Sequence, residues 1–174
     1  MIVFNKMVII DADILRSAGG INAQNEVSLF LSQLLSLVLE KNIKVGCDQK
    51  LFLEWKQHKS RYSSKWLSSM ISKRKLLRLP EDNDMSSSIS DAENLTTEQK
   101  RIALKDSHLI SNAINSDKIV ISKDDRARTI FCLLKEEIGG SLIEIYWVSL
   151  MTKKDTLFES ISNRYAHIDD ACKL

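Results

Sequence analysis

Two aspartates stand where apolar runs of the sequence end. Asp11 directly follows Met7–Ile10, and Asp124 lies two residues beyond Ile119–Ser122. Both runs are short and rich in β-branched residues, which is typical of buried strands. Because parallel strands share a direction, their carboxyl ends lie at one edge of a sheet, which is also where ligands bind. We therefore expect the two carboxylates to be neighbours at that edge.

Two further acids lie in predicted helices. Asp106 falls on the apolar stripe of a helix expected over 97–115, so its carboxylate points towards the buried layer. An unpaired charge there would cost several kcal/mol, and we expect a cationic partner. Glu54 lies early in the helix after a second strand at 43–47 and can reach the same sheet edge, with Glu40 as an alternative.

Carboxylates that lie this close repel one another. They are held together by a shared proton, by Lys or Arg, or by a divalent metal. Oxygen ligands favour Mg²⁺ or Mn²⁺, which keep coordination positions open for phosphate oxygens. One or two such ions activate a water and stabilise the charge that develops during in-line displacement. The pattern favours hydrolysis of phosphodiester bonds.

The elements that must position these acids alternate between strand and helix. Thr96 and Gln99 form a capping-box pattern, and Gly139-Gly140 ends a later helix. The chain predicts strands at 7–10, 43–47, 119–122 and 142–148, and helices over about 22–41, from 48, over 97–115 and over 126–138. This alternation predicts an α/β fold with three layers, α/β/α, and a mostly parallel central sheet. We expect one domain over 1–151 and a weaker helical tail over 152–174.

Four segments, taken in order, resemble the successive acidic motifs of PIN-domain nucleases. They are Ile9–Leu15, Glu54, Lys105–His108 and Val120–Asp124. The resemblance covers roughly residues 7 to 150 and implies a PIN-like fold and a ribonuclease that depends on Mg²⁺ or Mn²⁺. It implies a catalytic quartet of Asp11, Glu54, Asp106 and Asp124, with the metal held by Asp11, Asp106 and Asp124, and supporting roles for Asp13, Ser122 and Asp125.

The sequence departs from the family pattern in two places. Asp11-Ala12-Asp13 replaces the common Asp-Thr-Asn, which removes a hydroxyl and adds a charge. The second departure is an insertion at about 56–95, which is first basic and then acidic. The acidic part, with Ser86-Ser87-Ser88, predicts a mobile loop over 81–95.

The basic part of the insertion, residues 56–79, contains eight Lys or Arg and no Asp or Glu. Such cations can neutralise the phosphates of a nucleic-acid backbone. Tyr62 and Trp66 could stack on unpaired bases, although helical spacing also fits Trp66 to the core. The predicted nucleic-acid-binding residues are Lys56, Lys59, Arg61, Lys65, Lys73, Arg74, Lys75 and Arg78.

Histidine and cysteine contribute no motif of their own. His108 is two residues beyond Asp106, about 200° around a helix, so we do not expect it at the acidic site. His58 and His167 are isolated, and three widely spaced cysteines predict neither a disulfide framework nor a zinc site. The longest uncharged stretch, Val27–Leu39, is 13 residues long, well short of the ~20 that a membrane span needs. We expect a cytoplasmic protein that does not enter membranes.

These observations lead to one hypothesis and three rivals. The hypothesis is a metal-dependent endoribonuclease, in the manner of a prokaryotic toxin or defence component, acting on single-stranded or structured RNA. Its partners would be RNA and an antitoxin or other protein, and a homodimer is compatible with it. The rivals are a haloacid-dehalogenase-type phosphatase using Asp11 and Asp13, a relative of DNA 5′-nucleases, and a catalytically degenerate PIN module that binds RNA or a protein. The net charge of +2 is too small to decide among them.

Overall fold

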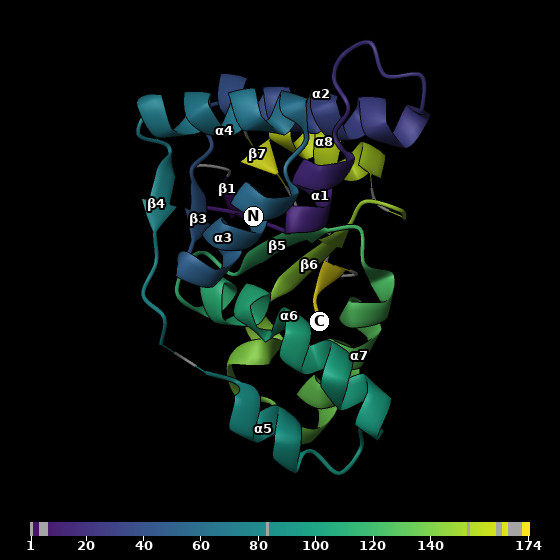
Figure 1. Ribbon diagram of the computed structural model, residues 1–174. Helices are drawn as coiled ribbons and strands as arrows, with labels where there is room; N and C mark the ends of the chain where they lie inside the picture. The colour runs from purple at the N-terminus through teal and green to yellow at the C-terminus, as the bar shows by residue number, and fades with distance from the viewer. Residues whose placement is uncertain (1, 4–6, 83, 153, 163–164, 167–171) are drawn as a thin grey trace.

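The fold is mixed α/β and mainly helical, as the computed structural model of the 174-residue chain shows (Figure 1). The structure describes residues 2–3, 7–82, 84–152, 154–162, 165–166 and 172–174. The strands are β1 (Ile2–Val3), β2 (Ile9–Ile10), β3 (Val45–Cys47), β4 (Leu76–Arg78), β5 (Ile119–Ser122), β6 (Tyr146–Ser149) and β7 (Tyr165–Ala166). The helices are α1 (Ala12–Ser17), α2 (Glu26–Glu40), α3 (Gln49–His58), α4 (Arg61–Ser72), α5 (Ser86–Asp91), α6 (Thr97–Ile114), α7 (Asp125–Ile138) and α8 (Lys154–Ser162), with a 3₁₀ helix, η1 (Gly140–Glu144).

The parallel strands form two groups that a single bridge joins. One group has the order β2-β5-β6, the other pairs β3 with β4, and a parallel bridge between Val8 and Val45 connects them. The strands therefore lie in the order β4-β3-β2-β5-β6. The chain moves outward from β2 to β4 and then returns to the other side of β2, so strand order reverses between β2 and β5. Crevices at such reversal points, beyond the carboxyl ends of the strands, are the usual ligand sites of these folds.

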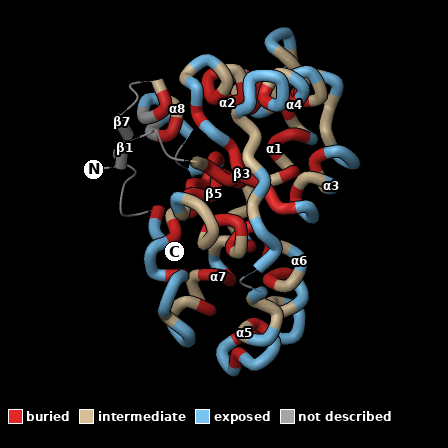
Figure 2. The backbone as a smooth tube through the Cα atoms, turned by 90° about the vertical axis from the view of Figure 1, so that its left-hand side faces the viewer, coloured by how far each residue is buried: buried red, intermediate tan, exposed pale blue. Residues whose placement is uncertain are grey.

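Helices cover the strands from two directions. In Figure 1, α2 and α4 lie above the strands, whereas α6 and α7 lie below them. Buried residues concentrate along β3 and β5 and on the helix sides that face them (Figure 2). The largest fully buried side chains include Trp55, Trp147 and Phe131. The predicted mostly parallel α/β fold is confirmed at this level.

Side chains cap the helices at the positions where the sequence places polar residues. Asn25 accepts from the amide of Ser28 at the start of α2, and Asp48 accepts from that of Leu51 at the start of α3. Thr96 and Gln99 form the predicted capping box of α6. Each such cap stabilises a helix by about 1 kcal/mol. These caps fix where α3 and α6, the carriers of two predicted acids, begin.

The predicted loop over 81–95 is wrong, because α5 forms within it. Ile89 on this helix is fully buried, and Leu95 after it is buried too, so the segment packs against α6 despite its polar composition. The backbone amides of Glu93 and Asn94 donate to the carboxylate of Glu137 at 2.8 and 3.0 Å. A few apolar residues and one carboxylate on α7 therefore hold a segment that is otherwise acidic.

The prediction of a last strand over 142–148 is wrong for residues 142–145. Gly139 and Gly140 both have positive φ, and the chain turns there into η1, which buries Leu142. The strand begins only at Tyr146. The predicted helical tail is confirmed over 154–162, whereas 165–166 form a strand that pairs antiparallel with β1. Residues 163–164 and 167–171, including His167, lie outside the described part.

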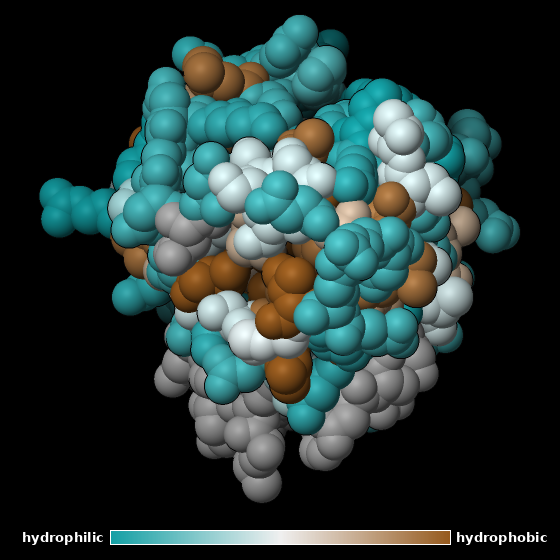
Figure 3. Space-filling view, turned by 90° about the horizontal axis from the view of Figure 1, so that it is seen from below, coloured by the Kyte–Doolittle hydropathy of each residue, from teal (hydrophilic) through white to brown (hydrophobic). Residues whose placement is uncertain are grey.

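Some apolar side chains also reach the surface. The exposed ones include Val27, Ile71 and Met151. Seen from below, the surface is mainly hydrophilic around a smaller apolar area near its centre (Figure 3). Among the described residues, no helix combines the length and apolar character that crossing a bilayer requires.

Candidate active site

The four predicted catalytic acids line one pocket. It has a volume of about 390 Å³ and lies at the carboxyl ends of β2 and β5, where strand order reverses. Asp11 follows β2, Glu54 comes from α3, Asp106 from α6, and Asp124 follows β5. The pocket is also lined by Ala12, Asp13, Arg16, Gln57, His58 and Lys105. Carboxylates from distant parts of the chain thus face the same space.

Ser122 connects the two acids that follow the strands. β2 and β5 are in parallel register, and the amide of Asp11 donates to the carbonyl of Ile121 at 3.0 Å. The Ser122 hydroxyl donates to Oδ2 of Asp11 at 2.7 Å and accepts from the amide of Asp124 at 3.0 Å. Ser122 is fully buried. It therefore fixes the orientation of Asp11 relative to Asp124.

Both strand-end acids are helix caps as well. Oδ1 of Asp11 accepts from the amide of Asp13 at 3.3 Å, and Oδ1 of Asp124 accepts from that of Ala127 at 2.9 Å. Each carboxylate thus satisfies a backbone donor at the start of α1 or α7. The same two side chains therefore cap helices and line the pocket. Capping alone does not require that both of them face one cavity.

Burial changes the pKa of Asp106, the acid that α6 contributes to the pocket. Its side chain is 14% exposed. Burial raises its pKa to about 6, and the charges of Asp11 and Asp124 add to the increase, while Lys105 and His108 oppose it. Nζ of Lys105 lies 3.9 Å from Oδ1 of Asp106, which supplies the cationic partner that the sequence predicts. Burial also raises the pKa of Asp11, against the hydrogen bond from Ser122.

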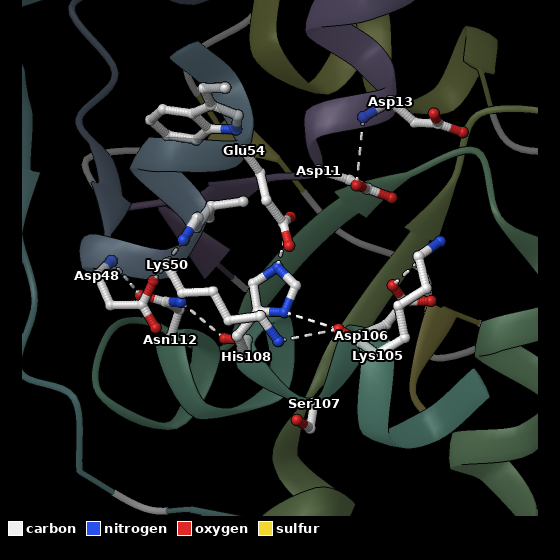
Figure 4. A network of polar contacts seen from close by, with 12 residues as sticks. Asp11, Asp13, Asp48, Lys50, Glu54, Lys105, Asp106, Ser107, His108 and Asn112 are labelled. Carbon is white, nitrogen blue, oxygen red and sulfur yellow. Dashed lines mark hydrogen bonds and ion pairs between the residues drawn. The ribbon is translucent and has the colours of Figure 1, made fainter. Parts of the chain in front are cut away.

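His108 is the site residue that sequence reasoning missed. Its Nε2 lies 3.0 Å from Oε2 of Glu54, and Figure 4 shows the carboxylate pointing from α3 towards the ring. Nδ1 lies 3.1 Å from the carbonyl of Lys105, which can only accept, so this nitrogen carries hydrogen. Burial raises the pKa of Glu54, but the hydrogen bond and charge of His108, with Lys50 and Lys105, outweigh burial and lower it.

A second polar residue of α6, Asn112, links the backbone of His108 to the start of α3. Asn112 lies one turn beyond His108, is buried, and donates to the carbonyl of His108 at 2.6 Å. Its Oδ1 accepts from the amide of Asp48 at 2.7 Å. His108 and Asn112 thus form a polar stripe that meets the start of α3. The sequence shows this stripe as two polar residues, four positions apart, in a largely apolar stretch. They lie on a different side of α6 from Asp106.

A buried tryptophan joins the elements that carry the first two acids. Nε1 of Trp55, next to Glu54, donates to the carbonyl of Ile10 at 2.9 Å. Ile10 immediately precedes Asp11. The hydrogen bond and the full burial of the indole therefore fix α3 against the end of β2.

The remaining predicted acids divide between the pocket and the surface. Asp13 lines the pocket, forms an ion pair with Arg16, and lies 3.9 Å from Nζ of Lys123. Asp125 is the first residue of α7 and is not among the residues that line this pocket. Glu40, the alternative to Glu54, ends α2 and is not among them either.

The basic residues of 56–78 lie outside the pocket lining and spread over α3, α4, the following turn and β4. Arg78 packs its guanidinium 3.7 Å from the centre of the Phe52 ring and donates to the carbonyl of Asp48. Trp66 is 4% exposed and donates to the carbonyl of Leu35, which confirms its alternative assignment to the core. The hydroxyl of Tyr62 is hydrogen-bonded to α2, so the ring is not free to stack on a base as expected.

The donor set suits a hard divalent cation but is not a closed cage. In the part of the chain that the structure describes, no group of three or more His, Cys, Asp or Glu side chains is arranged to hold a metal ion. The pocket nevertheless gathers carboxylate oxygens. Burial raises the pKa of Asp106, repulsion from Asp11 and Asp124 adds to the increase, and a cation would relieve that repulsion. Mg²⁺ keeps several waters and commonly takes only one or two carboxylates. The residues present therefore fit such an ion.

Comparison of the chain with family models, with curated proteins and with solved structures found no match. The functional conclusion therefore depends on the geometry and chemistry of the acidic pocket.

Proposed function

We propose that this chain is a PIN-like, metal-dependent nuclease that hydrolyses phosphodiester bonds of RNA. The observation that carries the proposal is the convergence of Asp11, Asp106 and Asp124 on one pocket at the point where strand order reverses. The helices that lie on two sides of the strands support the three-layer arrangement that this class would have. The order of the acidic motifs in the sequence agrees with the same class.

Asp11, Asp106 and Asp124 are the residues that would hold Mg²⁺ or Mn²⁺. Such an ion, when bound, supplies activation of a water and stabilisation of negative charge at the phosphate. Ser122 keeps the carboxylate of Asp11 in place through its 2.7 Å hydrogen bond. Asp106 has a pKa of about 6, so without a cation it binds a proton below that pH and carries a charge above it. Metal binding and protonation therefore compete at this carboxylate.

Cations beside the pocket would position the substrate. Lys105 and Arg16 line the pocket itself, and Gln57 and His58 bring the end of α3 to it. Lys56, Lys59, Arg61 and Lys65 continue from this end of α3 into α4. These side chains would contact phosphates of a strand that leaves the pocket along α4.

The test is cleavage of labelled single-stranded RNA and DNA by the whole chain with Mg²⁺, with Mn²⁺ and with a chelator. We expect cleavage of RNA that requires the metal and that is lost in Asp11→Asn. Asp125→Asn is the matched control, because Asp125 is an acid near the site that does not line the pocket. RNA that stays intact with both metals, or full activity of Asp11→Asn, would refute the assignment.

A second candidate is a catalytically degenerate module that binds RNA. It is favoured by the contact of Glu54 with His108 and by the ion pair of Asp13 with Arg16, which commit two of the pocket's carboxylates to side chains of the protein itself. Binding of RNA without cleavage in either metal would support this candidate over the nuclease.

A further inference from the structure

A second, smaller pocket opens at the same edge of the sheet as the acidic one. It lies beyond the carboxyl ends of β5 and β6, between the first turns of α2 and the start of α8. Its volume is about 120 Å³. The lining includes Val27, Phe30, Leu150 and Met151 together with two cations, Lys123 and Lys154.

Lys123 is the side chain that stands between the two pockets. It lines the smaller pocket, and its Nζ donates to Oγ of Ser17 at 2.6 Å. The same Nζ lies 3.9 Å from Oδ2 of Asp13, which lines the acidic pocket. Lys123 also directly precedes Asp124 in the chain. A strand whose phosphate lies at the acids would therefore have its neighbouring nucleotide within reach of the smaller pocket.

The smaller pocket has the chemistry of a site for one flat, uncharged ring. Its volume is well below the ~300 to 1,000 Å³ of pockets that take drug-sized ligands. Most of the lining is apolar, and Val27 and Met151 are 43% and 59% exposed, so water contacts apolar side chains that a ring would cover. Phe30 adds an aromatic ring, 5.9 Å from that of Phe158.

Charge complementarity indicates that the ring belongs to a nucleotide. Lys123 and Lys154 face the pocket, and Nζ of Lys154 lies 5.9 Å from the centre of the Phe30 ring. Glu26 is the one acid among the lining residues. Two lysines beside an apolar pocket match a base flanked by phosphates.

We propose that this pocket holds one unpaired base of the RNA strand, in the nucleotide next to the phosphate that lies at the acids. This inference rests on the proposed function for its substrate class. The pocket then favours single strands, because a paired base must lose its pairing and stacking, a cost of about a few kcal/mol, before it can enter. Its lining is mainly apolar, so it accepts different bases and requires only that a base be present.

The experiment compares RNA oligomers that differ only by one abasic position, moved along the strand. Affinity is measured by fluorescence anisotropy with Asp11→Asn, which retains the acceptor for Ser122 and leaves the RNA uncut. We expect one abasic position to weaken binding by about fivefold or more, the size of one stacked base, and the other positions to have smaller effects. Equal effects at all positions would overturn the proposal.

Variants locate the effect in the pocket. Val27→Thr combined with Met151→Gln, made in the same background, keeps side-chain size at two exposed positions but makes them polar, and should remove the abasic penalty. Ile71→Gln on α4, where Ile71 is 50% exposed, is the matched control and should retain it. A penalty that persists in the pocket variant would overturn the proposal and leave the pocket to another occupant, such as an apolar side chain of a protein.

The two proposals fail in different ways. In the first case, one abasic position weakens binding, the pocket variant removes this effect, and the wild-type chain cuts no RNA. This result supports the base pocket and refutes hydrolysis. Metal-dependent cleavage by the wild-type chain without any such penalty supports hydrolysis and refutes the base pocket.

Discussion

The acidic pocket and the basic segment 56–78 differ in how their charges are held. In the pocket, burial and short contacts fix the carboxylates: the hydroxyl of Ser122 donates to Asp11, and Nε2 of His108 lies 3.0 Å from Oε2 of Glu54. In the basic segment, six of the eight cations are exposed. A fixed, partly buried charge changes the pKa of its neighbours, whereas an exposed charge is screened by salt and water. Single substitutions should therefore have large effects in the pocket and small ones in the basic segment.

The largest effect is expected for Asp11→Asn. Asn keeps an oxygen that accepts from Ser122 and from the amide of Asp13, so the fold should persist while one charge is lost. We expect the rate of metal-dependent RNA cleavage to fall about a thousandfold or more, as when one preorganised electrostatic group is removed from an active site. Single-turnover cleavage is the measurement, with circular dichroism as the control for folding. A loss of less than tenfold would place the chemistry elsewhere.

Asp106→Asn should weaken function and strengthen the fold. Burial and neighbouring acids raise the pKa of Asp106 from 3.8 to about 6, so the charged form is disfavoured in the folded state. Below pH 4 the carboxyl group is protonated in both the folded and the unfolded state, so it does not change the free energy of unfolding. As the pH rises to 6 the group lowers this free energy more and more, and above pH 6 the loss is constant. Without metal, the variant should be more stable than wild type by up to about 3 kcal/mol at pH 8 and equally stable at pH 3.5.

Urea unfolding at the two pH values, with a chelator present, measures this difference. Asp125→Asn is the matched control, and it should show no such pH-dependent gain. Equal stability of wild type and Asp106→Asn at pH 8 would mean that the carboxylate is not held among other charges in the way that the structure describes.

The pair of Glu54 and His108 should show a coupling of about 1 kcal/mol in a double-mutant cycle. Glu54→Gln and His108→Gln remove one partner each, and the double variant should lose less stability than the sum of the two. The pKa of Glu54 is lowered, so the coupling should be present at neutral pH and be lost as the pH falls below the ordinary pKa of a carboxyl group, through the lowered one. Additive losses at pH 7 would show that the 3.0 Å contact carries no interaction energy.

The smallest effects are expected for the basic segment. Lys65→Gln and Arg78→Gln should each weaken RNA binding by no more than about threefold and reduce the slope of log affinity against log salt by about 0.7. Arg78→Gln should also destabilise the fold, because Arg78 packs on Phe52 and bonds to the carbonyl of Asp48. Anisotropy at several salt concentrations measures both slopes. A tenfold loss from Lys65→Gln alone would show that this surface contains a specific site.

Much of the scaffold follows from local patterns in the sequence. The β-branched runs before Asp11 and Asp124 become neighbouring parallel strands, and Thr96 caps α6 as its spacing with Gln99 predicts. Such features depend on a few adjacent residues. The placement of Asp106 beside the strand ends also follows, because helix periodicity fixes which side of α6 it faces. Glu54 reaches the same place from the helix that follows the second strand, as its position in the chain predicts.

The features that the sequence did not reveal depend on contacts between distant residues. α5 forms because Ile89 finds a buried place near α6 and because Glu137 meets the amides of 93 and 94, and none of this is visible within 81–95. The angle between His108 and Asp106 around α6 does not reveal the contact of His108 with Glu54, because Glu54 lies on a different helix. The hydrogen bonds that tie Tyr62 to α2 are equally hidden in the sequence, because they join residues about 30 positions apart.

The buried indole of Trp55 affects how α3 and the end of β2 move relative to one another. The indole donates a hydrogen bond to the carbonyl of Ile10. Glu54 precedes Trp55 and Asp11 follows Ile10 in the chain, so this bond connects the backbone next to both acids. Thermal displacement of α3 must then carry the end of β2 with it, so the separation between these two acids is insensitive to motion of the surrounding loops. Replacing the indole with phenyl would remove this bond and let the two acids move relative to one another, although no carboxylate is removed.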